Sequence, residues 1–194
     1  MTRYGYGGRI LRVDLGDRSF KVEQSNITWF KSVIGGRAAN TKRLYEELNT
    51  ECDPLGPENI IIYGVGPLTG SLLPASAYYT VTAKSPMTGI LGDSAAGGQF
   101  AAEMKLTGFD QIIITGESER PTYLMVTNDG VEFVECPELA GKNIVETTTA
   151  IRKLWAVKEN LSQVFQCRAG DPDGELPSFY AATSPPQELI GFYL

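Results

Sequence analysis

The hydrophobic and polar positions near the start of the chain alternate with the two-residue period of β-strands. Residues 10–15 and residues 19–23 both follow this alternation, and Gly16 with Asp17 supplies a turn between them. Because one face of each segment is apolar and a tight turn joins the two, the pattern predicts that the chain opens with a β-hairpin.

Two helices are predicted after this hairpin. The first is short and runs from a capping Asn26 or Thr28 through Lys31. The second follows a pair of glycines and covers residues 38–48, where the apolar positions approximate one face of a helix. These apolar positions are Ala38, Ala39, Leu44, Tyr45 and Leu48. We expect them on the buried side of the helix.

The rest of the pattern mixes short apolar runs with a further hairpin. Strands are predicted over residues 60–63, 79–83, 111–115, 122–127 and 131–136, and helices over residues 99–106 and 143–158. The step from Asp129 to Gly130 is a strong signal for a hairpin turn. Since hairpins replace strict βαβ alternation, the predicted fold class is α+β, with helices packed around β-sheets.

The composition excludes several classes of function. The 194-residue chain carries a net charge of −6 and has no run of lysine and arginine that would mark a nucleic-acid groove or an anionic membrane surface. It also lacks the apolar core of a signal peptide and the roughly 18 to 20 apolar residues of a membrane span. We therefore expect a cytoplasmic protein with neither nucleic acid nor membrane as a partner.

Histidine is absent from the sequence, which excludes Ser-His-Asp and Cys-His catalysis, H-E-x-x-H zinc sites and histidine general bases. The three cysteines, Cys52, Cys136 and Cys167, form no C-x-x-C pair and are predicted to be free thiols. No carboxylate pair stands at a recognisable catalytic spacing, so no catalytic residue is predicted. Any chemistry must come mostly from a cofactor, and the composition suits equally a domain with no chemistry.

The segment of residues 66–108 is rich in glycine and proline around one short predicted strand. Glycine-closed turns are predicted at residues 66–70, 85–89 and 92–98, and the last of them leads into the helix at 99–106. A glycine-rich loop that opens a helix exposes N–H groups that favour phosphate or another anion. The alternative is that these glycines serve only packing. The absence of G-x-G-x-x-G and G-x-x-x-x-G-K-[ST] from this region argues against a standard nucleotide fold.

Several segments, in the same order along most of the chain, resemble the amino-terminal domain of the aldehyde ferredoxin oxidoreductases. They are YGYGGRILRVDL at residues 4–15, VIGGRAA at 33–39, DPLGPEN at 53–59, GVGPLTG at 64–70, TAKSPMTG at 82–89, GDSAAGGQFAAEMKLTGFDQIIITG at 92–116 and ERPTYLMV at 119–126.

This resemblance implies a first domain with two β-sheets that are rich in hairpins and have helices packed around them. It also implies that the domain is the base for a tungsten or molybdenum bis-pyranopterin cofactor with Mg²⁺. In the complete enzyme of this family an aldehyde is oxidised to a carboxylic acid. The electrons then pass through a [4Fe–4S] cluster to ferredoxin.

The resemblance further implies which residues bind the cofactor. The family loop that runs beneath the pterin and its phosphates corresponds to Asp93, Ser94, Ala95, Ala96, Gly97 and Gly98. Within this loop the main-chain carbonyl of Ala95 corresponds to a ligand of the bridging Mg²⁺. Tyr78 stands where relatives commonly have an arginine that contacts a pterin phosphate, and its hydroxyl keeps one hydrogen bond without the charge. The alternative for Tyr78 is a strand residue that only packs on its neighbours.

Other charged residues have two interpretations. Lys84 is predicted either to reach a phosphate as a point charge or to remain a solvated surface lysine. Arg37 matches an arginine of the family motif, and it either faces the cofactor or caps a nearby carbonyl. Glu103, Lys105 and Asp110 are predicted to be surface or interdomain polar residues.

The end of the chain departs from the family pattern. We predict a cofactor-binding domain over residues 1–165 and a divergent, proline-rich tail over residues 166–194, which indicates a truncated or frame-shifted product or else a stand-alone first domain. Three cysteines cannot supply the four thiolates of a [4Fe–4S] cluster. The predicted partners are therefore the remainder of the enzyme or a separate chain, with ferredoxin for the complete enzyme and a homodimer as a further candidate. The alternative function is a non-catalytic fragment or interaction domain that keeps the fold without the metal cofactor.

Overall fold

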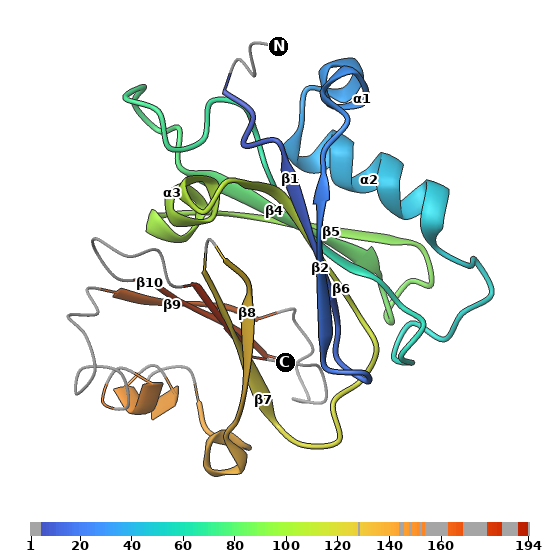
Figure 1. The fold of residues 1–194 in the computed structure, drawn as a ribbon. Coiled ribbons are helices and arrows are strands. Elements are labelled where there is room, and N and C mark those ends of the chain that lie inside the picture. The colour runs from blue at the N-terminus through green and yellow to red at the C-terminus, as the bar shows by residue number, and fades with distance from the viewer. Residues whose placement is uncertain are drawn as a thin grey trace. The chain divides into compact units, whose positions relative to one another are not determined.

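The computed structural model describes residues 5–127, 129–143, 146–147, 149–151, 153, 163–168, 178–183 and 190–193. The chain divides into two compact units, residues 1–117 and residues 118–194 (Figure 1). Among the described residues, no helix combines the length and the apolar character needed to cross a membrane.

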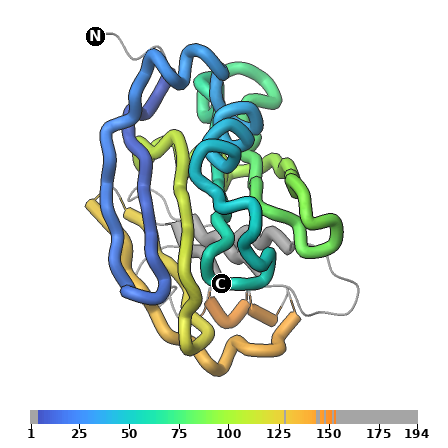
Figure 2. Tube along the Cα trace, turned by 90° about the vertical axis from the view of Figure 1, so that its right-hand side faces the viewer, coloured from blue at the N-terminus to red at the C-terminus, as the bar shows by residue number. Residues whose placement is uncertain are grey.

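The first unit is built on a six-stranded sheet. Its strands are β1 (Arg9–Asp14), β2 (Ser19–Gln24), β3 (Ile61–Val65), β4 (Tyr78–Lys84), β5 (Leu91–Gly97) and β6 (Phe109–Thr115), in the spatial order β2-β1-β6-β3-β4-β5. All neighbours are antiparallel except β1 and β6, which are parallel. Figure 2 shows β6 beside the blue hairpin of β1 and β2. The first and last strands of this unit are therefore neighbours within the sheet.

Three helices cover this sheet: α1 (Ile27–Val33), α2 (Gly36–Glu47) and α3 (Gln99–Leu106). Successive residues of a strand point to opposite faces. On one face Ile62 packs in a buried cluster that joins strand residues to α1 and α2. The other members are Phe30 of α1, Ala39 and Leu44 of α2, Ile10 of β1, Ile113 of β6, and Ile60 just before β3. On the opposite face the ring of Tyr63 packs with those of Tyr79 and Phe100, the latter from α3. Helices α2 and α3 thus bury opposite faces of one sheet.

The second unit begins with the predicted hairpin at Gly130. Strands β7 (Thr122–Val126) and β8 (Val131–Glu135) are antiparallel, and β11 (Ile190–Tyr193) pairs with the other side of β7. Strands β9 (Gln163–Arg168) and β10 (Ser178–Thr183) form a separate antiparallel pair. A short 3₁₀ helix, η1 (Pro137–Leu139), follows β8.

The helix predicted over residues 143–158 is described only in its first part. Residues 146–147, 149–151 and 153 are helical, and the other residues of this prediction lie outside the described part of the chain. Asn143 and Glu146 cap its start reciprocally: the Glu146 N–H donates to Asn143 Oδ1 at 3.0 Å, and the Asn143 N–H donates to Glu146 Oε2 at 3.1 Å.

The predicted α+β class is confirmed by this mixture of hairpin-rich sheets and helices. One local prediction is wrong. Residues 92–98 were expected to form a glycine-closed turn, but β5 spans Leu91–Gly97 and pairs with β4 along its whole length. Glycine and alanine weaken the intrinsic preference for a strand, so the pairing partner decides this segment.

Helix α2 differs from its prediction in which residues it buries. Ala39 and Leu44 are buried as expected, but Tyr45 is 89% exposed and Ala38 is exposed too. Asn40, which no apolar pattern selects, is fully buried. The reason is a set of polar groups on the sheet, described below, that the amide of Asn40 satisfies.

Candidate functional site

The predicted site lies on β4 and β5, at an edge of the six-stranded sheet. Tyr78 begins β4, and Gly97 ends β5 directly opposite it. The cross-strand pairs that share this face are Tyr78–Gly97, Thr80–Ala95 and Thr82–Asp93. Asn40 of α2 donates to the Thr80 carbonyl at 3.2 Å and to its hydroxyl at 3.1 Å, which identifies the face as the one that α2 covers.

Strand β5 presents main chain rather than large side chains. Ser94, Ala95 and Gly97 are exposed, and Ala96 is half-buried. The ring of Tyr78 lies over Gly97: a Cβ atom built on this glycine would be 3.4 Å from the Tyr78 Cε1 and Cζ atoms. Tyr78 itself is 56% exposed. Strand β5 therefore presents an exposed stretch of small residues, called the floor below, with the Tyr78 hydroxyl at its end.

Two helices begin at the same end of the sheet as Tyr78. Helix α2 starts after Gly35, whose Cβ position would be only 3.1 Å from the Val65 carbonyl at the end of β3. Helix α3 starts after Gly98, whose N–H donates to the Ala77 carbonyl at 2.9 Å, immediately before β4. Because Val65 pairs with Tyr79, the two helix starts flank the beginning of β4.

Neither of these helix starts is capped by a side chain. The N-cap residues are Gly35 and Gly98, and the first turns of α2 and α3 contain no acidic residue. In contrast, the Asn26 side chain caps α1 by accepting from the Thr28 and Trp29 N–H groups. The N-terminal N–H groups and the helix dipole favour an anion near such an end. The arrangement therefore places two sources of positive potential beside β4 and β5.

The turns predicted at residues 66–70 and 85–89 are confirmed. In the first, Thr69 Oγ1 accepts from the Gly66 N–H at 3.1 Å and donates to the Tyr78 carbonyl at 3.1 Å, which ties this turn to the start of β4. In the second, the Gly89 N–H donates to the Ser85 carbonyl at 2.8 Å. The first turn lies at the candidate site, and the second lies at the far end of β4.

Lys84 is not brought together with the other predicted site residues. It ends β4, and a strand of this length separates it from Tyr78 by about 20 Å. Its Nζ donates to the carbonyls of Thr50 at 2.6 Å and Cys52 at 2.8 Å. In the structure the ammonium therefore holds the loop after α2 in place.

Arg37 of α2 contacts β5 through Asp93. Its Nε forms an ion pair with Asp93 Oδ2 at 2.5 Å. The Thr82 hydroxyl donates to the other carboxylate oxygen of Asp93 at 3.5 Å. The Asp93 side chain is 14% exposed and that of Arg37 is 65% exposed. A largely buried carboxylate thus holds an exposed guanidinium over β5.

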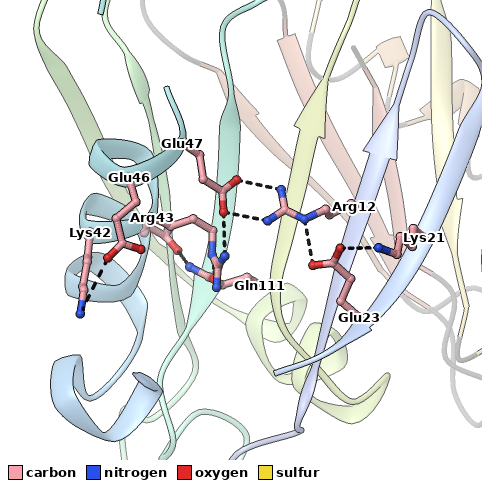
Figure 3. Close-up of polar contacts among 9 residues, drawn as sticks. Arg12, Lys21, Glu23, Lys42, Arg43, Glu46, Glu47 and Gln111 are labelled. Carbon is pink, nitrogen blue, oxygen red and sulfur yellow. Dashed lines mark hydrogen bonds and ion pairs between the residues drawn. The ribbon is translucent and has the colours of Figure 1, made fainter. Parts of the chain in front are cut away.

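A polar network on the same face of the sheet was not predicted from the sequence (Figure 3). Gln111 Nε2 donates to Asn40 Oδ1 at 2.9 Å, and Arg43 Nε donates to Gln111 Oε1 at 2.6 Å. Glu47 accepts from Arg43 at 2.8 Å and from both terminal nitrogens of Arg12 at 2.7 and 2.8 Å. The network connects α2 to β1 and β6. Arg43 and Glu47 have the local i,i+4 spacing of a helix pair, whereas the contacts with Gln111 and Arg12 join distant parts of the chain.

The charged groups of this network shift each other's pKa values. Burial alone would raise the pKa of Glu47, but hydrogen bonds from Arg12 and Arg43 lower it below its ordinary value. Hydrogen bonds from Arg12 and Lys21 likewise lower the pKa of Glu23. The Glu47 hydrogen bond is also the main reason that the pKa of Arg12 is raised. These shifts mark structural ion pairs.

The prediction that Asp110 and Lys105 are surface or interdomain polar residues is wrong. Asp110 is fully buried and accepts from the Gly7 N–H at 2.9 Å, the Gly8 N–H at 2.8 Å and Lys105 Nζ at 2.6 Å. Lys105 is only 10% exposed. The buried carboxylate fixes the N-terminal glycines, which lie about a hundred residues away along the chain, so local sequence cannot indicate this contact.

Cys52 and Cys136 are both free and buried. Burial raises the pKa of Cys136 to about 12, which disfavours the thiolate that a metal would need. Within the described residues, no group of three or more histidine, cysteine, aspartate or glutamate side chains is placed to hold a metal ion.

Comparisons with known proteins agree with the predicted resemblance. The sequence model of the aldehyde ferredoxin oxidoreductase N-terminal domain matches residues 10–182. The chain is 41% identical over 150 residues to a tungsten-containing aldehyde ferredoxin oxidoreductase of Thermococcus kodakarensis and 37% identical over 150 residues to one of Pyrococcus furiosus. Each match covers 77% of this chain and 25% of the relative, so the chain spans about a quarter of the length of these relatives.

A solved structure shows the same fold. A chain of the active site complex BamBC of benzoyl coenzyme A reductase, with 1,5-dienoyl-CoA, superposes with a TM-score of 0.77 at 32% identity. The superposition covers 83% of this chain and 24% of that one. With the match to residues 10–182, these likenesses show that the chain belongs to the aldehyde ferredoxin oxidoreductase family and carries its N-terminal domain.

Proposed function

We propose that this chain binds a tungsten or molybdenum bis-pyranopterin cofactor for an oxidoreductase that converts aldehydes to carboxylic acids. The observation that carries the proposal is the family match over residues 10–182, the range that contains every predicted site residue. The electron path of the complete enzyme, through a [4Fe–4S] cluster to ferredoxin, would need residues beyond those described here, from the rest of the enzyme or from a separate chain.

The residues present suit the anionic part of such a cofactor. The uncapped starts of α2 and α3 can direct N–H groups toward phosphate, and the small residues of β5 leave space above the main chain. The Ala95 main-chain carbonyl would supply an oxygen ligand to Mg²⁺, which prefers oxygen ligands. The Tyr78 hydroxyl would donate one hydrogen bond to a phosphate.

The division of work between protein and cofactor follows from the site. When bound, the metal and its pterin dithiolenes supply the two-electron redox chemistry of aldehyde oxidation. The chain's own residues would orient the cofactor through its phosphates. Asp93, Ala95 and Gly97 lie on one face of β5, and Tyr78 closes one end of this face. Ser94 and Ala96 would contribute main chain between them, and Gly98 is the N-cap residue of α3. No general acid or base is assigned to this unit.

A second candidate function is a family member that keeps the fold without the cofactor. The observation that favours it is Tyr78, a neutral and half-exposed side chain where relatives commonly have an arginine. In this case the uncapped helix starts and β5 would serve association with another chain.

The experiment that separates the two candidates is metal and pterin analysis of the chain purified without oxygen from its native host. Tungsten and molybdenum are measured by elemental mass spectrometry, and pterin by the fluorescence of its oxidised form. Stoichiometric metal and pterin would support the proposal. A folded chain without either would overturn it and leave the cofactor-free alternative.

A pair of charge variants makes this experiment specific to the site. Ala95→Glu places a carboxylate on exposed β5, where it would repel phosphate, and should abolish pterin retention. Gln24→Glu makes the same change in charge on exposed β2, at the opposite edge of the sheet, and should retain it. Equal pterin content in the two variants would show that the cofactor does not bind at β5.

A further inference from the structure

Arg37 occupies a position that is electrostatically unfavourable for a cation. It is the second residue of α2, which begins at Gly36, and the N-terminus of a helix carries the positive end of its dipole. A cation in the first turn is therefore destabilising, whereas an acidic residue would be favoured there. Such a departure from a local rule is expected where function requires it.

Asp93 compensates only part of this charge and fixes its position. The carboxylate lies 2.5 Å from Arg37 Nε and is itself held by the Thr82 hydroxyl. A guanidinium has five N–H donors, so the ion pair through Nε leaves the terminal nitrogens for another group. No further hydrogen bond or ion pair of Arg37 occurs within the described part of the chain.

The Arg37 side chain extends along the part of β5 that is proposed to bind the cofactor. The Arg37 backbone lies close to Gly35, which approaches Val65 at the end of β3, and Val65 pairs with Tyr79 of β4. The Arg37 Nε contacts Asp93 of β5, which pairs with Thr82 further along β4. Ala95 lies opposite Thr80, which is between Tyr79 and Thr82 on β4, and shares a face with Asp93. The exposed guanidinium is thus held above the part of β5 that is proposed to bind the cofactor.

We infer that Arg37, oriented by Asp93, is a phosphate-binding residue of this chain and supplies the cation that the tyrosine at position 78 does not. This inference rests on the proposed function, because a phosphate-bearing ligand over β5 is its premise. Arginine suits the role because its planar fork can donate two parallel hydrogen bonds to phosphate oxygens. Asp93 acts through Arg37 and is a positioning residue.

The test compares phosphate affinity and pterin retention in Arg37→Gln and in the unmodified 194-residue chain. Inorganic pyrophosphate with Mg²⁺ is titrated by calorimetry, and pterin is measured after anaerobic purification. Loss of one charged hydrogen-bonding group should weaken pyrophosphate binding about tenfold. Arg37→Lys keeps the charge without the fork and should fall between the two, which also guards against misfolding of the glutamine variant.

Arg120→Gln is the matched control. Its side chain is 68% exposed and forms an ion pair with Glu135 at 3.3 Å, so this variant loses the same charge and a comparable surface contact in the second unit. Its pyrophosphate affinity should equal that of the unmodified chain. In the Arg37→Gln background, Tyr78→Arg should restore binding, which a merely structural role for Arg37 would not predict.

The outcomes separate this inference from the proposed function. If the unmodified chain binds pyrophosphate and pterin, and Arg37→Gln binds both equally well, the inference alone is overturned. If the unmodified chain binds neither, the proposed function and the inference are both overturned. If Arg37→Gln loses both pyrophosphate affinity and pterin, Arg37 is supported as a residue that binds the phosphate of the pterin. If it loses only pyrophosphate affinity, Arg37 is supported as the binding residue of a free phosphate.

Discussion

The close approach of Gly64 and Asn40 shows how one missing side chain determines the polar interior of the first unit. A Cβ atom at Gly64 would lie 2.1 Å from Asn40 Oδ1 and 2.9 Å from Asn40 Nδ2. This amide donates to Ile62 and Thr80 and accepts from Gln111. The backbone at Gly64 does not have a positive φ, so position 64 requires glycine for a steric reason alone.

Gly64→Ala should therefore destabilise the protein. The added methyl group must displace the buried amide and break its hydrogen bonds, which should cost about 2–4 kcal/mol in free energy of unfolding. Urea unfolding followed by circular dichroism measures this loss. Gly66→Ala is the control, because its nearest neighbour would be Thr69 Oγ1 at an ordinary 3.8 Å. Similar unfolding midpoints for the two variants would refute the steric argument.

Cys136 gives a second prediction for a single residue. Its pKa of about 12 is raised mainly by burial, so very little thiolate is present at pH 8. In the native chain it should react with iodoacetamide far more slowly than in the same chain unfolded in urea. Mass spectrometry of the peptide that contains Cys136 gives both rates. Rapid native labelling would mean that the thiol is accessible or more acidic than its surroundings indicate.

Helix α2 combines an apolar contact with the sheet and a charged connection at its last residue. Glu47 accepts hydrogen bonds from Arg12 and Arg43. The exposed fraction of the side chain is 26% for Glu47, 31% for Arg12 and 12% for Arg43. These bonds hold the pKa of Glu47 below its ordinary value. A carboxylate with a lowered folded-state pKa stabilises the protein above its unfolded-state pKa, and this contribution is lost as the pH falls through the lowered value.

Glu47→Gln should consequently destabilise the chain in a pH-dependent way. At pH 7 the variant should lose about 1–3 kcal/mol in free energy of unfolding, because two arginines lose a charged partner. The difference from the unmodified chain should shrink as the pH falls below about 4. Denaturant unfolding at pH 7, 5 and 3 measures it.

Glu46→Gln is the neighbouring control on the same helix. Glu46 pairs with Lys42 at 3.9 Å, and both side chains are about 40% exposed, so the variant should change the free energy of unfolding by less than about 0.5 kcal/mol at any of these pH values. If the effect of Glu47→Gln does not depend on pH, its cause is packing rather than ionisation.

The sequence predicted those elements whose signals are local. Helix α3 was predicted with the bounds Gln99–Leu106 that it has, and Asn26 was one of two residues predicted to cap α1, with Thr28 as the alternative. Strand β5 was missed because its glycines and alanines resemble a loop until β4 pairs with them. At the candidate site, Tyr78 lies opposite Gly97 at the end of β5. Lys84 lies far from Tyr78 because the two residues are at opposite ends of β4, a separation that the strand predicted over residues 79–83 already implies.

The contacts between distant parts of the chain escaped sequence reasoning for a related reason. Gln111 is 71 residues from Asn40, and Asp110 is more than a hundred residues from Gly7. Their polar side chains look like ordinary surface residues in the sequence, because burial becomes favourable only when the fold supplies their partners. Such residues are identifiable only once the topology is known.

At the scale of the whole molecule, the first unit contains all the strands of its sheet. Strand β6 lies between β1 and β3 and is buried along nearly its whole length. Its parallel pairing with β1 joins residues about a hundred positions apart, and the Leu15 N–H adds a hydrogen bond to the Thr115 carbonyl at 2.9 Å. Residues 1–117 therefore include both edges and the centre of one sheet, together with the helices on its two faces.

We accordingly expect a chain ended after Glu117 to fold without the second unit. It should keep the circular dichroism of a mixed α+β protein and unfold in a single cooperative urea transition, as small single domains do. A chain ended after Gly108 is the control. It lacks β6, so the β1–β2 hairpin loses the strand beside β1, and the buried faces of α2 and α3 lose part of their cover. This shorter chain should be unfolded or aggregate. If both truncated chains are unfolded while the full chain is folded, the first unit depends on the second for its stability, and its compactness reflects contact density rather than autonomous folding.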